Sequence, residues 1–337
     1  PGSLTATARQ QKSNEATTTA NDDREEDMTA HDDIQTIRTV GFIGLGSMGL
    51  PMALNLLKAG FVVRGHSRNA ERTRLFTQAG GIDAPDLGSI LEKADAVITM
   101  VPDGDVVEEL MEAPDGIAAR APRGSLMLDM STIAPDQARS LAARCRDLGI
   151  DFLDAPVSGG TKGARDGSLT IMVGGEEAAF AKAQPLLSAM GTTITHMGQE
   201  GSGQVTKAAN QLMVGGALAV LSEAIILLEH NGVNPVHALG ALSQGLAGSR
   251  ILDLKGETAV SRSFNPTFTI RLHSKDMGIV QSTARSSGCC LPTASSVAQL
   301  FTAAEANGWT DLDHSALLKV IELLSGTSSN DQREEQS

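Results

Sequence analysis

The chain has 337 residues, of which 40 are acidic and 27 are Lys or Arg, so its formal net charge at pH 7 is −13. This length allows two domains, and the acidity argues against nucleic acid or an anionic membrane surface as a main partner. The longest apolar run, Leu212 to Leu221, is too short to cross a membrane, and the three cysteines lack metal-binding spacing. We therefore expect a soluble, cytoplasmic protein with no metal site and no disulfide framework.

The two ends of the chain have the composition of segments outside a folded domain. Residues 1–36 are rich in Thr, Ala, Asn, Gln, Asp and Glu and begin with the tag-like Pro1-Gly-Ser. Such a sequence offers too little apolar surface for a core, so we expect a disordered, tag-like segment there. Residues 327–337 are also polar and are expected to form a tail.

Strand and helix patterns alternate from Val40 to about His196, which predicts a mainly parallel sheet with helices on both faces. The expected strands are Val40–Ile43, Phe61–Val63, Ala96–Val101, Leu126–Asp129, Asp151–Leu153, Leu169–Val173 and Thr193–His196, and the helices between them include Pro135–Arg146 and Glu176–Met190. Helical patterns alone follow, at Thr206–His230, Pro235–Leu242, Ser274–Ser287, Ser295–Asn307 and Ser315–Leu324. We expect an α/β domain at residues 37–199 and an all-helical domain at 200–326, joined by a long interdomain helix.

A glycine-rich turn joins the first expected strand to the helix that follows it. Its sequence, Gly44-Leu45-Gly46-Ser47-Met48-Gly49, has the spacing Gly-x-Gly-x-x-Gly. In this spacing the first glycine permits a tight turn, the second lets the backbone approach a pyrophosphate, and the third lets the helix pack closely on the strand. The N–H groups at the helix start can then bind phosphate. We expect a dinucleotide here, so the α/β domain is predicted to be of the Rossmann type.

The end of the second expected strand indicates which dinucleotide is preferred. NAD-binding folds usually place an acidic residue about 20 residues further on to bind the ribose hydroxyls. Here the segment reads Ser67-Arg68-Asn69, and the nearest acid, Glu71, already belongs to the next helical pattern. Because a guanidinium suits a 2′-phosphate, Ser67 and Arg68 favour NADP over NAD.

Two further loops follow expected strands, at the edge where open α/β sheets bind ligands. The first runs from Asp129 to Pro135, and the hydroxyls of Ser131 and Thr132 can contact a ligand, cap the next helix, or do both. The second ends in Ser158-Gly159-Gly160, whose small residues let backbone N–H groups approach a carboxylate. An ordinary turn is the alternative interpretation of this second loop.

The long expected helix Thr206–His230 carries a lysine and two carboxamides on one face. Lys207, Asn210 and Gln211 are three and four residues apart, so they can point to one spot. Burial moves the pKa of a lysine toward neutrality, and such a lysine can give a proton to a carbonyl oxygen and take it back. Apolar residues lie nearly all round the helix, which predicts burial in a core or a subunit interface. A lysine on a solvated helix face is the alternative.

Together these motifs resemble those of the β-hydroxyacid dehydrogenases, the 3-hydroxyisobutyrate dehydrogenase family. The resemblance runs from about Arg38 to Leu324 and includes, in order, Gly44–Gly49, Asp154–Gly160, Gly201–Gln211 and Lys275-Asp276. It is closest to the tartronate semialdehyde reductase (2-hydroxy-3-oxopropionate reductase) branch. That placement depends on Gln211, where many members have a second asparagine, and on the segments Gly245–Ser249 and Arg271–Asp276.

The resemblance implies a role for each matching residue. Lys207 is the general acid/base, Ser158, Gly159 and Gly160 bind the substrate carboxylate, and Asn210 and Gln211 hold the substrate. The residues implied to lie at the cofactor, besides the glycine turn, are Val101, Pro102, Thr132 and Lys275. The resemblance also implies a homodimer or a homotetramer.

The expected function is NAD(P)H-dependent reduction of a small carboxylate semialdehyde to a hydroxy acid, with tartronate semialdehyde and D-glycerate as the best-supported pair. One alternative is 3-hydroxyisobutyrate dehydrogenase or another member of the family, and a second is an NADP-binding interaction protein without catalysis. The presence of Lys207 favours an enzyme. The histidines have no expected catalytic role: His314 is expected at a helix start, and His273 either lines the site or packs.

Overall fold

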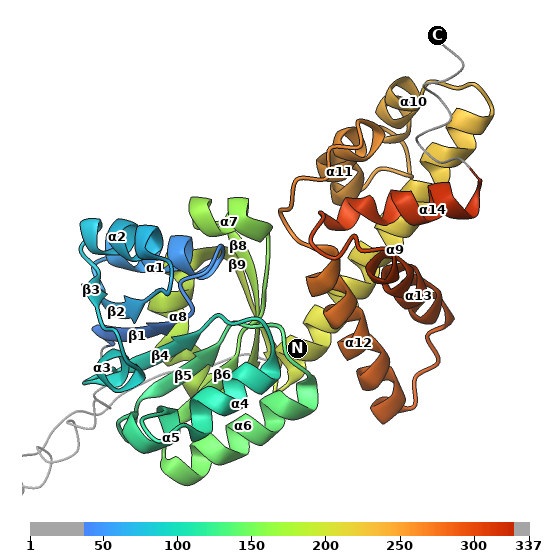
Figure 1. The fold of residues 1–337 in the computed structure, drawn as a ribbon. Coiled ribbons are helices and arrows are strands. Elements are labelled where there is room, and N and C mark those ends of the chain that lie inside the picture. The colour runs from blue at the N-terminus through green and yellow to red at the C-terminus, as the bar shows by residue number, and fades with distance from the viewer. Residues whose placement is uncertain (1–36, 327–337) are drawn as a thin grey trace, which may run out of the picture. The chain divides into compact units, whose positions relative to one another are not determined.

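The computed structural model describes residues 37–326, so the expectations for residues 1–36 and 327–337 lie outside the described residues. Nine strands form one sheet in the order β3-β2-β1-β4-β5-β6-β8-β7, with β9 paired to β8 (Figure 1). The strands are β1 (Thr39–Ile43), β2 (Val62–His66), β3 (Ile82–Asp83), β4 (Ala96–Thr99), β5 (Leu126–Asp129), β6 (Asp151–Asp154), β7 (Val157–Ser158), β8 (Leu169–Gly175) and β9 (Gly191–Gly198).

The sheet is mainly parallel, as expected from the alternation of strands and helices. The pairs β1–β2, β2–β3, β1–β4, β4–β5, β5–β6 and β8–β9 are parallel. Strand β8 runs antiparallel to β6 and β7, which the sequence did not predict. Strands β3 and β7 were also missed, because a strand of two residues shows no alternation from which to recognise it.

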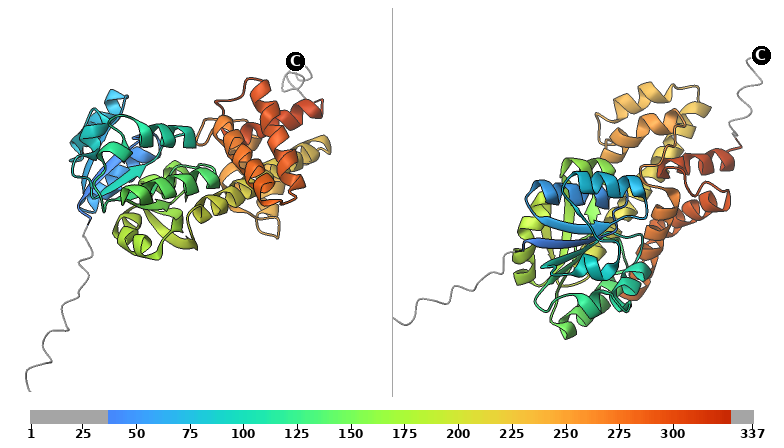
Figure 2. Two further views of the ribbon diagram at one scale, coloured as in Figure 1. Left: turned by 90° about the horizontal axis from the view of Figure 1, so that it is seen from below. Right: turned by 60° about the vertical axis from the view of Figure 1, so that its left-hand side comes forward.

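Helices cover both faces of the sheet, as Figure 2 shows in two further views. Along β5, Leu126 and Leu128 belong to one apolar core, while Met127 between them belongs to the other. This alternation is the expected consequence of a period of two in a strand buried on both faces. The helices that contribute buried residues to the first core are α1 (Gly49–Lys58), α2 (Ala70–Gln78), α7 (Gly160–Asp166) and α8 (Glu177–Met190), and those of the second are α3 (Leu87–Leu91), α4 (Gly104–Glu112), α5 (Ile117–Arg120) and α6 (Pro135–Leu148).

Helices make up the described chain after β9. They are α9 (Ser202–His230), α10 (Pro235–Leu242), α11 (Arg250–Val260), α12 (Ile270–Ser287), α13 (Pro292–Ala306), the 3₁₀ turn η1 (His314–Leu317) and α14 (Leu318–Leu324). Helix α11 was not predicted, and α9, α12 and α13 each begin before the expected residue. For α12 the reason is Thr269, whose side chain accepts a hydrogen bond from Leu272 N and caps the helix one turn before Ser274.

Helix α9 runs through the core of this helical part, where it contacts α11, α12, α13 and α14. Its buried face includes Leu218, Ile225 and Ile226. The expectation that no segment is long and apolar enough to cross a membrane was wrong, because α9 passes that test when hydropathy is averaged over 18 residues. This is weak evidence for a membrane span, since the core helix of a soluble protein passes it too, and 44% of that window is buried within the protein.

Part of the apolar surface of α9 is exposed in the single chain. Met213, Val220 and Leu227 are 75%, 66% and 67% exposed, and they recur every seven residues, so they lie along one side of the helix. Of the expected burial in a core or a subunit interface, the single chain therefore accounts for one side of the helix, which lies in the core.

Candidate functional site

The turn between β1 and α1 has the geometry of a phosphate-binding loop. Gly44 has φ +103°, and a Cβ there would lie 2.3 Å from the Met100 carbonyl oxygen, while a Cβ on Gly49 would lie 1.9 Å from the Gly44 carbonyl oxygen. Both positions therefore require glycine. A Cβ on Gly46 would meet none of the described atoms within 4 Å, which leaves space beside its backbone. Within residues 37–326, no side chain caps α1, so N–H groups at its start can receive a phosphate. These residues fit a dinucleotide.

The other residues of this turn differ in what they can offer a ligand. Leu45 is buried in the core, so only its backbone can face a ligand, whereas Ser47 is exposed and Met48 is partly exposed. The Ser47 hydroxyl accepts a hydrogen bond from Arg72 Nη2 at 3.4 Å. Arg72, on α2, was not among the expected site residues, and it brings a guanidinium to the glycine turn.

The end of β2 presents basic and acidic groups together. Arg68 is exposed, and the backbone of Ser67 is fixed by Thr73, whose hydroxyl donates to the Ser67 carbonyl oxygen at 2.9 Å. The fold also brings Asp83 to this end of the sheet, where its Oδ1 lies 2.7 Å from His66 Nδ1. The sequence around Arg68 contains no acid before Glu71, but tertiary structure supplies one from β3.

Lys275 contacts two other loops that were expected at the cofactor. From α12, its Nζ donates to the Pro102 carbonyl oxygen at 3.0 Å and to the Thr132 carbonyl oxygen at 2.5 Å. Val101 N donates to the hydroxyl of Ser131, beside Thr132, at 3.0 Å. The structure therefore brings Val101, Pro102, Thr132 and Lys275 together at the loops after β4 and β5.

Lys207 is buried on α9 with its ammonium group beside the loop of Ser158, Gly159 and Gly160, the serine–glycine loop. The residue is 7% exposed, and its Nζ donates to the Val157 carbonyl oxygen at 2.8 Å, next to Ser158. Burial lowers the pKa of Lys207 to about 8; the charge of Asp276 opposes this shift, and that of Lys275 adds to it. Lys207 can thus exchange a proton near neutral pH.

The two carboxamides after Lys207 form a chain of hydrogen bonds to an acid on α12. Asn210 Nδ2 donates to Gln211 Oε1 at 2.8 Å, and Gln211 Nε2 donates to Asp276 Oδ2 at 2.6 Å. The other oxygen of Asp276 lies 3.1 Å from Lys275 Nζ. Gln211 is buried with both ends of its amide bonded, whereas Asn210 is partly exposed, so direct contact with substrate stays a prediction for both residues.

The serine–glycine loop lies where β7 leads into α7. Ser158 is the last residue of β7 and is partly exposed, and Gly159 and Gly160 are exposed. Gly159 has φ +128° and Gly160 has φ +60°, conformations that favour glycine, and a Cβ on Gly160 would meet no described atom within 4 Å. The loop therefore presents backbone to open space close to Lys207.

Asp154 and Gln204 hold these parts together, although neither residue was assigned a role from the sequence. The Asp154 carboxylate accepts from Gly201 N at 2.7 Å and from Gln204 N at 2.8 Å, so it caps α9 from the end of β6. Burial raises the pKa of Asp154 to about 7, although the two backbone donors oppose the shift. The amide of Gln204 bonds Ser131 O and Ile133 N. An acid at the end of a buried strand was the available signal for Asp154.

Among the described residues, no group of three or more His, Cys, Asp and Glu side chains has the arrangement of a metal site.

Known proteins resemble the chain over both its α/β part and its helical part. The profile of the NAD binding domain of 6-phosphogluconate dehydrogenase matches residues 39–198, and that of the NAD-binding region of NADP-dependent 3-hydroxyisobutyrate dehydrogenase matches residues 201–321. The chain is 40% identical to 2-hydroxy-3-oxopropionate reductase of Escherichia coli strain K12 over 85% of this chain and 97% of that protein. It is 35% identical to 2-(hydroxymethyl)glutarate dehydrogenase of Eubacterium barkeri over 86% and 96%.

Among solved structures, the crystal structure of 3-hydroxyisobutyrate dehydrogenase from Salmonella typhimurium is similar. The TM-score is 0.78 at 29% identity, and the match covers 84% of this chain and 99% of that one.

Proposed function

Because the chain belongs to the β-hydroxyacid dehydrogenase family, whose members are NAD(P)-dependent oxidoreductases of hydroxy acids, we propose that it reduces a small carboxylate semialdehyde with Lys207 as general acid/base. The observation that carries this role is the burial of Lys207, with its lowered pKa and its ammonium group 2.8 Å from the backbone beside Ser158. A non-catalytic NADP-binding protein is not favoured, because the relatives are dehydrogenases and reductases.

The residues that would hold the cofactor are those of the glycine turn, with Ser67, Arg68, Val101, Pro102, Thr132 and Lys275. When bound, the nicotinamide supplies the hydride that reduces the carbonyl carbon. NADP remains the preferred cofactor in our proposal, because two arginines lie close to the expected phosphate site. Arg68 follows the end of β2, and Arg72 on α2 reaches Ser47 in the glycine turn. Asp83, which lies beside His66 at this end of the sheet, favours NAD instead.

The chain's own residues account for substrate orientation and proton transfer. Ser158 and the backbone of Gly159 and Gly160 would bind the substrate carboxylate, which places the carbonyl oxygen toward Lys207. As hydride arrives at the carbon, Lys207 Nζ donates a proton to the developing alkoxide, and in the reverse direction the neutral amine removes the proton of the hydroxyl. Asn210, being partly exposed, would bind the substrate oxygen, and Gln211 would orient Asn210.

For the substrate, we propose tartronate semialdehyde, reduced to D-glycerate, with 3-hydroxyisobutyrate dehydrogenase activity as the alternative. Two points support this proposal: the identity to 2-hydroxy-3-oxopropionate reductase is 40%, against 35% for 2-(hydroxymethyl)glutarate dehydrogenase, and the chain has Gln211 after Asn210. A site that hydrogen-bonds a hydroxyl rejects a methyl analogue, because its own polar groups are then left unpaired.

The test is to measure kcat/KM for tartronate semialdehyde and for methylmalonate semialdehyde, each with NADPH and NADH. We expect a preference of at least about 10²-fold for tartronate semialdehyde, or roughly 2.7 kcal/mol. Comparable values on the two substrates would move the protein to the 3-hydroxyisobutyrate branch and leave the role of Lys207 intact.

We further propose a cytoplasmic homodimer or homotetramer in which a second copy covers the exposed stripe of α9. The stripe of Met213, Val220 and Leu227 is apolar and repeats every seven residues, which suits packing against another helix. Light scattering of the purified protein measures the assembly.

A further inference from the structure

Two buried histidines lie behind the turn of α9 that carries the carboxamides. His273 is on α12 and His314 begins η1, and they are 0% and 5% exposed. His273 Nε2 lies 3.1 Å from the carbonyl oxygen of Gln211, and His273 Nδ1 lies 3.0 Å from His314 Nδ1. His273 thus contacts the backbone of Gln211. The side chain of Gln211 binds Asp276, which lies one turn after His273 on α12.

These contacts determine where the ring protons must be. A carbonyl oxygen can only accept, so His273 Nε2 carries a hydrogen. The contact between the two Nδ1 atoms needs one hydrogen, which belongs to His314 if His273 is neutral. Burial lowers the pKa of His273 to about 4 and that of His314 to about 3, and the nearby Lys207 and Lys255 add to these shifts, so both rings are neutral near pH 7. The charges of Asp276 and Asp313 oppose the shifts without reversing them.

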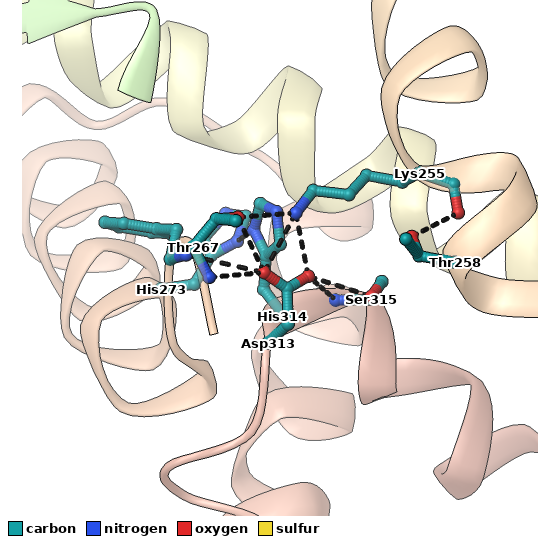
Figure 3. Close-up of polar contacts among 8 residues, drawn as sticks. Lys255, Thr258, Thr267, His273, Asp313, His314 and Ser315 are labelled. Carbon is teal, nitrogen blue, oxygen red and sulfur yellow. Dashed lines mark hydrogen bonds and ion pairs between the residues drawn. The ribbon is translucent and has the colours of Figure 1, made fainter. Parts of the chain in front are cut away.

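The far side of the pair is anchored by a buried ion pair, shown in Figure 3. The Asp313 carboxylate accepts from Lys255 Nζ at 2.8 and 2.9 Å, from the hydroxyl of Thr267 at 2.7 Å and from that of Ser315 at 2.8 Å. His314 N also donates to the Phe268 carbonyl oxygen at 2.8 Å. The turn that carries His314 is therefore fixed to the segment before α12 and to α11.

The fit on the α9 side is close. A Cβ added to Gly215, one turn after Gln211, would lie 3.2 Å from His273 Nε2 and 3.0 Å from a Val297 methyl carbon. Because Gly215 has no side chain, the imidazole of His273 has space to reach the backbone of α9. Direct ring-to-backbone contact transmits the position of α12 and η1 to the turn of α9.

From these contacts we infer that His273 and His314 are positioning residues. His273 in its Nε2–H form and His314 in its Nδ1–H form fix the turn of α9 that holds Gln211. They thereby also fix the preceding turn, which holds Lys207. The inference rests on the proposed role of Lys207. Neither histidine touches the reacting atoms; they act through the helix backbone and Gln211.

The first experiment compares His273→Leu, which removes the donor, with His273→Gln, whose amide can still donate to the Gln211 carbonyl oxygen. We expect His273→Leu to lower kcat at least about tenfold with KM nearly unchanged, because a displacement of about 1 Å can cost up to 10²-fold in rate. His273→Gln should recover kcat to within about threefold of the wild type. The matched control is Ser222→Ala, which removes a buried hydrogen bond to the Leu218 carbonyl oxygen elsewhere on α9 and should leave kcat unchanged.

The second experiment measures the wild-type protein and uses a variant only for assignment, so it holds even if His273→Leu fails to fold. Nitrogen-15 NMR of histidine-labelled wild-type protein at pH 7 should show His273 protonated at Nε2 and His314 protonated at Nδ1, with the signals of the pair assigned through His314→Asn. A positively charged ring, or His314 protonated at Nε2 only, overturns the inference, and so does wild-type kcat in His273→Leu. If Lys207→Ala proves fully active, the proposed function fails instead, and the tautomers are unaffected by that outcome.

Discussion

Gln211 Nε2 and Asp276 Oδ2 lie 2.6 Å apart, which joins the helix of the buried lysine to α12 across 65 residues of sequence. Asp276 contacts Lys275 through its other oxygen, so one carboxylate orients a carboxamide and lies close to two lysines. Its negative charge raises the pKa of Lys207 against the effect of burial. The proton affinity of Lys207 therefore depends in part on the charge of Asp276, a residue on a different helix.

Asp276→Asn should move the pH dependence of reduction to lower pH. Reduction needs protonated Lys207, so its rate falls as pH rises through the Lys207 pKa, which is about 8. Without the Asp276 charge this pKa falls, and a shift of about one unit would cut the rate above pH 8 about tenfold. The reverse reaction, oxidation, needs the neutral amine of Lys207, so its rate at low pH should rise when the pKa of Lys207 falls. The control is Asp311→Asn, at an exposed ion pair with Arg271, and an unshifted profile in Asp276→Asn contradicts the electrostatic link.

Lys207→Ala should keep the fold and NADPH binding and lose at least about 10²-fold in kcat, the lower range for a lost general acid. Lys207→Arg should be similarly slow, since a guanidinium does not give up its proton near neutral pH. Steady-state kinetics and NADPH fluorescence titration measure the two properties separately. Normal turnover with intact cofactor binding would remove the mechanism proposed here.

Arg68→Ala should raise the KM for NADPH and leave that for NADH nearly unchanged. The expected loss is about 1.5–3 kcal/mol, the range for a hydrogen bond to a charged group. Arg72→Ala should act in the same direction, because Arg72 Nη2 reaches Ser47 in the glycine turn. Arg144→Ala, which removes an exposed ion pair with Glu112, serves as the control. A wild-type enzyme that prefers NADH tenfold would contradict the assignment of Arg68.

Asp154→Asn should destabilise the start of α9. The carboxylate accepts from both Gly201 N and Gln204 N, and an amide replaces one acceptor with a donor that faces an N–H group. We expect a loss of about 1–3 kcal/mol in the free energy of unfolding, measured by urea denaturation. Asp166→Asn, at an exposed pair with Lys162, should change stability far less. Equal stability in the two variants would show that the cap is dispensable.

The sequence by itself determined the features that depend on short-range periodicity. The spacing Gly44–Gly49 predicted a turn in which Gly44 and Gly49 are required by positive φ or close contact, and the alternation of strands and helices predicted the mainly parallel sheet. The three-residue and four-residue steps from Lys207 to Asn210 and Gln211 follow from helix geometry alone. Such patterns can be recognised in a sequence because neighbouring side chains in a helix or strand point in fixed relative directions.

Only the tertiary structure decided what surrounds Lys207. Lys275 reaches Pro102 across 173 residues of sequence, Asp154 caps α9 across 47, and His273 meets His314 across 41. No local pattern encodes these distances, because they depend on how α9, α12 and η1 pack on one another and on the loops after β4, β5 and β6. The pKa of Lys207 follows from the same packing, since burial and the charges of Asp276 and Lys275 exist only once these elements have come together.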